Sequence, residues 1–182
     1  EVVGVRGEAP HNVTLVEDVE QARTLEIDDP CKVACLSQTT LSVDETAAII
    51  DVLRERFPEL IVPKKSDICY ATQNRQEAVK ALAREVDLML VLGSHNSSNS
   101  NRLVDVARSL GTDAHLIHDV DDIEPQWLQD ARTIGLSSGA STPEILVERI
   151  VDHLQERGST QVSTLEVARE DVTFSQIGRA HV

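Results

Sequence analysis

Short apolar blocks alternate along this chain with longer amphipathic segments. Residues 88–92 (Leu-Met-Leu-Val-Leu) are the clearest apolar block, and a continuous run of this length is typical of a buried strand. The amphipathic segments repeat their apolar residues every three or four positions, which is typical of helices. The pattern predicts strands at 32–36, 60–62, 88–92, 114–117 and 133–136, helices at 43–56, 74–85, 99–110 and 144–157, and a helical turn at 125–128.

The order of these elements predicts the fold class. Strands that alternate with helices of ten to fifteen residues indicate βαβ units and parallel sheets. Ser42 and Glu45 form the pattern of a capping box before the helix at 43–56, and residues 141–144 (Ser-Thr-Pro-Glu) are expected to cap the last helix. We therefore expect an α/β fold of two αβα lobes with largely parallel sheets.

Composition and charge narrow the class of protein. The 182 residues are 41% hydrophobic but only 2% aromatic, so the core is expected to consist of aliphatic side chains. A net charge of −14 argues against nucleic acids and anionic membranes as partners. No apolar run approaches the roughly 20 residues of a membrane span. Three cysteines do not form a disulfide framework, and we expect a cytoplasmic protein.

Small polar residues cluster after three of the expected strands, at 37–40 (Ser-Gln-Thr-Thr), 94–101 (Ser-His-Asn-Ser-Ser-Asn-Ser-Asn) and 137–141 (Ser-Ser-Gly-Ala-Ser). In α/β proteins the carboxyl ends of strands bind ligands, and N–H groups at helix starts bind anions. The clusters favour a phosphorylated small molecule. The stretch at 94–101 is no P-loop, because it lacks Gly-Lys-Ser/Thr, and an ordinary capped helix predicts the same residue types there.

Cys69 lies in a segment that connects an expected strand to a helix beginning near Asn74. A thiol near a helix N-terminus has its thiolate form favoured, which suits a nucleophile or a metal ligand. The alternative is a buried cysteine that acts as a small hydrophobic residue. By their surroundings we assign Cys35 to the core and Cys31 to a loop.

Four ordered motifs resemble one family. Residues 38–42 (Gln-Thr-Thr-Leu-Ser), 67–76 (Asp-Ile-Cys-Tyr-Ala-Thr-Gln-Asn-Arg-Gln), 93–103 and 139–143 stand in the order of the 4-hydroxy-3-methylbut-2-enyl diphosphate reductases. These iron–sulfur enzymes end the methylerythritol phosphate route to isoprenoids. The resemblance implies a trefoil of three αβα lobes around a [4Fe–4S] cluster. Three cysteines hold that cluster and leave one iron open for the substrate hydroxyl oxygen.

The resemblance also implies roles for particular residues. Cys69 matches the third cluster ligand, Thr39 matches the threonine that positions the substrate hydroxyl, and Glu1 matches the proton-donating glutamate. The implied diphosphate-binding residues are Ser97, Ser98, Asn99 and Ser141. The implied reaction is reductive dehydroxylation of an allylic diphosphate to isopentenyl and dimethylallyl diphosphate. A ferredoxin or flavodoxin is the implied electron donor.

The chain departs from the family by lacking its first lobe and, with it, two of the three cluster cysteines. We therefore expect a fragment, inactive alone, with the middle lobe at 1–64 and the C-terminal lobe at 65–157. A tail at 158–176 is expected to return toward the missing lobe. Residues 177–182 (Ile-Gly-Arg-Ala-His-Val) match the translation of a common sequencing adapter and are expected to be non-native.

A second hypothesis comes from a different class of function. The three polar clusters are complete without any metal cluster. Under this hypothesis, the chain is a non-catalytic module of two αβα lobes that binds a phosphorylated ligand.

Overall fold

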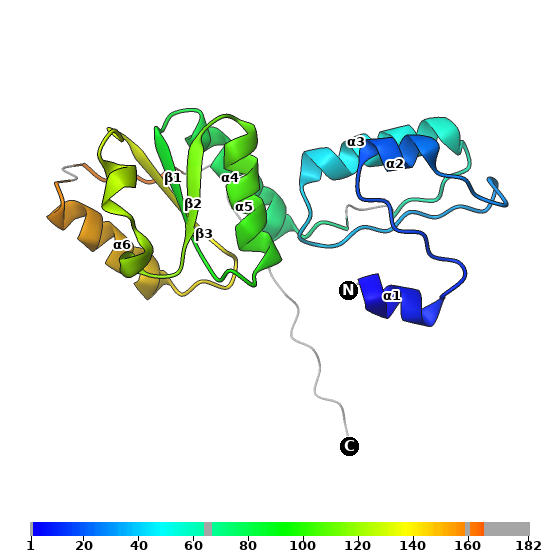
Figure 1. Ribbon diagram of the computed structural model, residues 1–182, viewed down its shortest axis with the longest axis horizontal. Helices are drawn as coiled ribbons and strands as arrows, with labels where there is room; N and C mark the ends of the chain where they lie inside the picture. Colours follow the sequence, from blue (N-terminus) through cyan, green and yellow to red (C-terminus); the bar gives the residue numbers. More distant parts are fainter. Residues whose placement is uncertain (1, 64–66, 159–160, 166–182) are drawn as a thin grey trace, which may run out of the picture.

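The computed structural model describes residues 2–63, 67–158 and 161–165. These residues form two lobes that lie end to end along the long axis of the molecule (Figure 1). The N-terminal lobe contains α1 (Val2–Glu8), α2 (Val19–Thr24) and α3 (Val43–Arg56). The elements of the C-terminal lobe are α4 (Tyr70–Ala83), β1 (Leu88–Leu92), α5 (Ser98–Ser109), β2 (Asp113–Ile117), the 3-10 turns η1 (Val120–Asp122) and η2 (Pro125–Leu128), β3 (Ile134–Ser138) and α6 (Glu144–Glu156).

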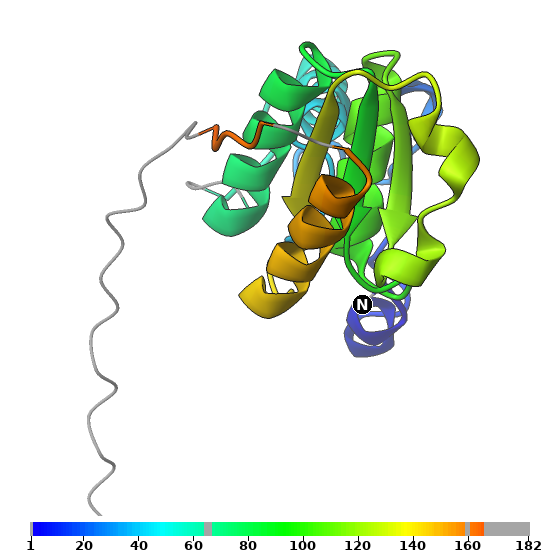
Figure 2. The same ribbon diagram turned by 90° about the vertical axis from the view of Figure 1, so that its left-hand side faces the viewer.

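The C-terminal lobe is built on a parallel sheet with strand order β2-β1-β3. All five residues of β1 are buried because helices cover both faces of the sheet (Figure 2). Met89 and Val91 pack against α4 and α5, while the alternate residues Leu88, Leu90 and Leu92 pack on the side of α6. The continuous apolar run is therefore explained by burial on both sides.

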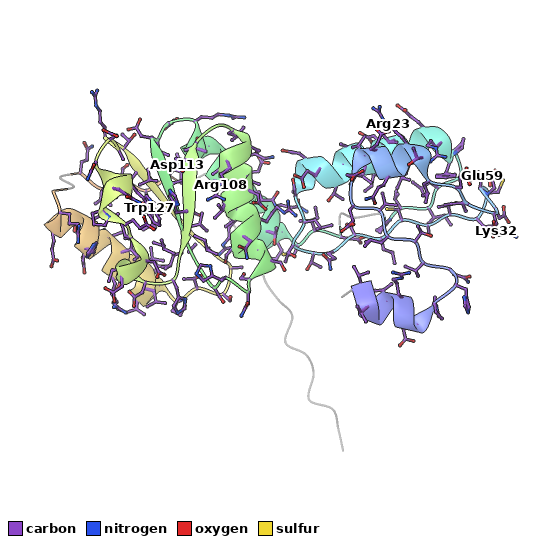
Figure 3. The ribbon with its side chains drawn as sticks, viewed as in Figure 1. Arg23, Lys32, Glu59, Arg108, Asp113 and Trp127 are labelled. Carbon is purple, nitrogen blue, oxygen red and sulfur yellow. The ribbon has the colours of Figure 1, made fainter. Side chains whose placement is uncertain are left out.

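The outer edge of β2 is covered by side chains of its own lobe (Figure 3). Arg108 reaches across from α5, and its Nε and Nη2 both donate to the carbonyl oxygen of Ala114, at 3.0 and 2.6 Å. The Trp127 ring stacks on the imidazole of His115, with centroids 3.7 Å apart and planes 6° apart. Arg108 thus occupies a backbone carbonyl at the open edge of β2, where a further strand would pair.

The N-terminal lobe has a less regular core. Ala22 of α2 and Leu53 of α3 pack with Phe57 against two extended segments. The strands expected at 32–36 and 60–62 are reduced to a single parallel bridge between Ala34 and Ile61. The expectation of two full strands was wrong.

The pairing is short because other residues of the lobe cover only one face of the two extended segments. Ile61 donates its N–H to the Val33 oxygen and accepts from the Cys35 N–H, both at 2.9 Å. Ile61 of the bridge is itself 67% exposed, and Leu36, beyond the bridge, is 75% exposed. Apolar residues that face solvent contribute little burial to extend the ladder.

Several helix and strand boundaries differ from those expected. The α/β class and the helix at Val43–Arg56 are confirmed. Helix α4 begins at Tyr70 rather than near Asn74, so Cys69 is its N-cap residue. Strand β3 includes Ser137 and Ser138, which were expected in the following loop.

The start of the last helix also differs from the expectation. Residues 141–144 were expected to cap it, with the proline near its start. Helix α6 instead has Pro143 at its N-cap with no side-chain cap hydrogen bond. The hydroxyl of Thr142 is engaged elsewhere, since it donates to the carbonyl oxygen of Leu92 at 3.1 Å. The Thr142 side chain therefore forms a hydrogen bond with the sheet edge and does not cap the helix.

Asp87 provides a test of this fold through pH. Its Oδ2 accepts from the N–H and hydroxyl of Thr133 and from the N–H of Arg132, each at 2.9 Å. The bonds from Thr133, and then the bond from Arg132, lower the pKa of this carboxyl. Its contribution to stability is therefore present above the unfolded-state pKa of about 3.9 and is lost as pH falls through the lower folded-state pKa.

We expect Asp87→Asn to lower the free energy of unfolding at pH 7, and the difference from wild type to shrink below about pH 4. Urea unfolding across this pH range measures it. Asp130→Asn, a change at an exposed aspartate, is the control and is expected to have little effect. A wild-type-to-variant difference that stays constant with pH would contradict this interpretation.

Candidate functional site

The carboxyl edge of the parallel sheet brings two glycines together. Gly93 follows β1 and donates its N–H to the oxygen of Ile117, and Gly139 follows β3 and donates to the oxygen of Leu92, both at 2.9 Å. The loops after β1 and β3 therefore leave the sheet side by side. This is the edge at which α/β folds bind ligands.

The first turn of α5 rests on these glycines. Ser97 caps the helix, since its Oγ accepts from the N–H of Ser100 at 3.2 Å. The Ser100 side chain is 1% exposed and fills the space beside both glycines. A Cβ on Gly93 or on Gly139 would collide with the Ser100 Oγ. The absence of side chains at both positions lets the helix N-terminus approach the sheet edge closely.

Asn99 is the unusual residue of this turn. It is 7% exposed, and within the described residues neither its Oδ1 nor its Nδ2 has a hydrogen-bond partner. A buried amide without partners costs roughly 1–3 kcal/mol for each unsatisfied group, so such groups in native proteins require an explanation. The N-terminal turn of a helix also carries backbone N–H groups that favour an anion. A bound anion would accept hydrogen bonds from the Nδ2 of Asn99 and from these backbone N–H groups.

A polar cleft separates this turn from the N-terminal lobe. It has a volume of about 290 Å³ and is lined by Gln38, Thr40, Leu41, Ser98, Asn101, Arg102 and Asp105. The cleft thus joins two of the polar clusters that lie sixty positions apart in sequence. Arg102 lines it but is already paired, since its Nη1 lies 3.0 Å from the Glu45 carboxylate.

Gln76 of α4 holds one wall of the cleft in place. Its side chain is fully buried. The carboxamide oxygen accepts from the N–H of Val43 at 3.0 Å, and the nitrogen donates to the oxygen of Leu41 at 2.8 Å. Val43 is the first residue of α3, whose N–H has no partner within its own helix. Gln76 therefore joins the two lobes through paired backbone groups.

Cys69 and Thr39 lie at the same junction. The N–H of Cys69 donates to the carbonyl oxygen of Thr39 at 3.1 Å. Cys69 is exposed at the N-cap of α4, and its Sγ lies 3.0 Å from the hydroxyl of Thr72. The alternative, that Cys69 is a buried hydrophobic residue, is therefore excluded.

The described cysteines differ in their fitness to hold an iron–sulfur cluster. Cys69 is an exposed thiol at the N-cap of α4, so its sulfur is accessible and fits one cluster ligand. Burial, and then the charge of Asp67, raise the pKa of Cys35, which makes it a poor thiolate ligand. Across 2–63, 67–158 and 161–165 no three His, Cys, Asp or Glu side chains gather as a metal site.

The remaining predicted site residues have different positions. Ser98 is exposed and lines the cleft, while Ser141 is exposed and lies two residues beyond Gly139. Glu1 lies outside the described residues, as do 166–182, so the predicted adapter-derived segment and most of the predicted tail have no structural description.

Sequence reasoning missed Gln76 and did not single out Ser100. A signal for both was present. Gln76 stands at the spacing of the buried Val79 and Ala83, and Ser100 stands at the spacing of the buried Leu103 and Ala107. A polar residue in the apolar stripe of a helix needs a partner for its polar atoms.

Comparison with known proteins decides the family. Residues 1–155 match the LytB protein family. The chain belongs to this family. The resemblance inferred from the four motifs is thereby confirmed.

Named relatives agree with this assignment. A Streptomyces avermitilis protein named 4-hydroxy-3-methylbut-2-enyl diphosphate reductase is 52% identical over 176 residues, covering 96% of this chain and 52% of that protein. A protein of the same name from Aromatoleum aromaticum is 50% identical over 174 residues, covering 96% of this chain and 56% of that protein.

A solved structure also matches. The E-1-hydroxy-2-methyl-but-2-enyl-4-diphosphate reductase from Plasmodium falciparum is 37% identical and superposes with a TM-score of 0.78, covering 85% of this chain and 48% of that chain. The chain therefore spans about half the length of the relatives it matches. No helix in the described part of the chain is long and apolar enough to cross a membrane.

Gln76→Leu tests the link between the lobes. It removes both hydrogen bonds and leaves the N–H of Val43 and the oxygen of Leu41 without their partner, which is expected to cost about 2–4 kcal/mol. Urea unfolding measures the loss. Gln155→Leu, at an exposed position of α6, is the matched control and is expected to stay within about 0.5 kcal/mol of wild type. Equal stability of the two variants would show that the link contributes nothing.

Proposed function

We propose that this chain is a part of a 4-hydroxy-3-methylbut-2-enyl diphosphate reductase and supplies its diphosphate-binding loops and one ligand of its [4Fe–4S] cluster. The whole protein removes the hydroxyl of the allylic diphosphate. The carbon–oxygen bond breaks, and two electrons and two protons enter. Water leaves, and isopentenyl or dimethylallyl diphosphate is the product. A ferredoxin or flavodoxin supplies the electrons.

The observation that carries the proposal is the buried carboxamide of Asn99 at the N-terminus of α5, which has no hydrogen-bond partner among the described residues. A diphosphate oxygen accepts hydrogen bonds, and such bonds from neutral donors to an ionised group are stronger than those between neutral partners. We assign Asn99 to the diphosphate together with Ser97, Ser98 and Ser141. This assignment also explains why hydroxyls and an amide surround the helix start without bulky neighbours.

The junction between the lobes supports the rest of the proposal. Thr39 and Cys69 are adjacent through their backbones, which places both residues at the junction between the lobes. We assign Thr39 to positioning that hydroxyl, Glu1 to donating a proton to it, and Cys69 to the cluster. The cluster, when bound, supplies electrons and a Lewis-acidic iron. Two of its three cysteine ligands come from outside this chain.

A second candidate function is a non-catalytic module that binds a phosphorylated ligand. The gathering of Gly93, Gly139, Ser100 and Asn99 at one sheet edge favours it, since this arrangement needs no metal. The two candidates share the anion site and differ in whether the rest of the protein adds a redox centre.

A chimaera distinguishes the two candidates. This chain is joined to the part of the Streptomyces avermitilis reductase that it does not cover, and the protein is loaded with iron and sulfide. We expect turnover of the allylic diphosphate with a reduced viologen dye as donor. Loaded protein that binds the substrate without turnover would favour the module.

Asn99→Ala in this chimaera is expected to raise KM roughly 10- to 100-fold, because charge-assisted hydrogen bonds to the diphosphate are lost. Iron content and the visible spectrum are expected to stay unchanged. Steady-state kinetics and iron analysis measure both. Asn12→Ala, on an exposed loop of the N-terminal lobe, is the control. Loss of iron with KM retained would assign Asn99 to the wrong part of the site.

This chain alone is expected to assemble no cluster. A [4Fe–4S] cluster requires converging thiolates, and Cys69 supplies one of them. Anaerobic reconstitution with iron and sulfide, followed by visible absorbance and size-exclusion chromatography, measures this. A monomer with one cluster per chain would contradict the proposed division of ligands.

A further inference from the structure

We propose that Ser100 is a positioning residue that aims the hydroxyl proton of Ser97 at the bound diphosphate. This inference rests on the proposed function, because it concerns the same anion site. Ser100 itself is buried beneath the helix start and does not touch the ligand.

The hydrogen bonds of Ser97 carry the argument. A serine hydroxyl has one proton to donate and two lone pairs that accept. The Ser97 Oγ accepts from the N–H of Ser100 at 3.2 Å and from the hydroxyl of Ser100 at 3.0 Å. Both lone pairs are thereby used. The Ser97 hydroxyl can therefore still donate its own proton, but it cannot accept a further hydrogen bond.

The position of Ser100 keeps this arrangement rigid. Its side chain is 1% exposed and lies against the backbone of Gly93 and Gly139, where a Cβ on either glycine would collide with it. Its hydroxyl therefore has little freedom to turn away from Ser97. The glycines that end β1 and β3 thus act on Ser97 through Ser100.

Asn99 indicates that this arrangement is more than a helix cap, and Ser109 provides a contrast within the same helix. The hydroxyl of Ser109, near the end of the same helix, donates to the carbonyl oxygen of Val106 at 2.8 Å. This bond stays within the last turn of the helix. Asn99, directly before Ser100, is buried, and neither polar atom of its side chain has a partner in the part of the chain that the structure describes. Within the described residues, the Nδ2 of Asn99 and the hydroxyl proton of Ser97 have no acceptor, and both belong to the same turn. An ionised phosphate oxygen accepts from both donors.

The arrangement also selects among ligands. A Ser97 hydroxyl whose lone pairs are occupied cannot accept a hydrogen bond from a ligand. A fully ionised phosphate presents only acceptors, whereas a protonated phosphate or an amine presents donors. Ser100 therefore favours the ionised form of the diphosphate.

A double-mutant cycle on this chain tests the proposal, with inorganic pyrophosphate as the probe and calorimetry as the measurement. Ser97→Ala is expected to weaken pyrophosphate binding roughly 10- to 100-fold, and Ser100→Ala roughly 3- to 10-fold. In the double variant, Ser100→Ala is expected to add no further loss. Ser109→Ala is the control and is expected to leave binding unchanged, while circular dichroism reports folding.

Gly139→Ala provides a second route, because its Cβ displaces the Ser100 side chain while both hydroxyls remain. It is expected to weaken pyrophosphate binding in the wild-type background and not in the Ser97→Ala background. If Ser100→Ala does not fold, the Gly139 cycle decides the question.

The outcomes separate the two proposals. If the wild-type chain does not bind pyrophosphate, the proposed anion site fails and this inference falls with it. Normal binding by folded Ser100→Ala, or losses that add fully in the double variant, overturns the role of Ser100 alone. A merely structural role for Ser100 lowers stability without coupling to Ser97.

Discussion

The close contact between the first turn of α5 and the carboxyl edge of the sheet is the constraint on which the candidate site depends. Ser100 occupies space that exists only because positions 93 and 139 carry no side chain. This contact brings the positive end of a helix dipole to the place where two strands end. Asn99 precedes Ser100 in this turn and is buried, and its amide has no partner within the described residues. Packing and binding capacity thus arise from one steric fit.

The connection between the lobes depends on a different kind of interaction. Lys80, which is partly buried, forms an ion pair with the exposed carboxylate of Asp44 at 2.8 Å across this junction. Ion pairs with an exposed partner contribute little to stability. Gln76 is fully buried and satisfies one backbone donor and one acceptor of the neighbouring loop. Leaving those groups unpaired is costly, so this residue positions the Thr39 loop more firmly than the surface charges do.

The electrostatics of the chain explain the chemistry of the candidate site. A net charge of −14 opposes the approach of a diphosphate. The groups gathered at the sheet edge are nonetheless neutral hydroxyls, an amide and backbone N–H groups, and Arg102 beside them is paired with Glu45. Fixed dipoles bind an anion at short range without altering the charge of the surface. Such a site recognises the ligand by directed donors rather than by an excess of positive charge.

The sequence by itself determined the α/β class, the central strand and the motif order that identifies the family, because these follow from local periodicity and residue identity. It also singled out Cys69 and Asn99 as candidate site residues. Only the tertiary structure decided that the strands of the N-terminal lobe shrink to one bridge, since pairing depends on what covers each face. It alone assigned partners to Gln76 and Ser100, because a hydrogen bond between residues distant in sequence, or a fit between a hydroxyl and two glycines, leaves no periodic signal in the chain.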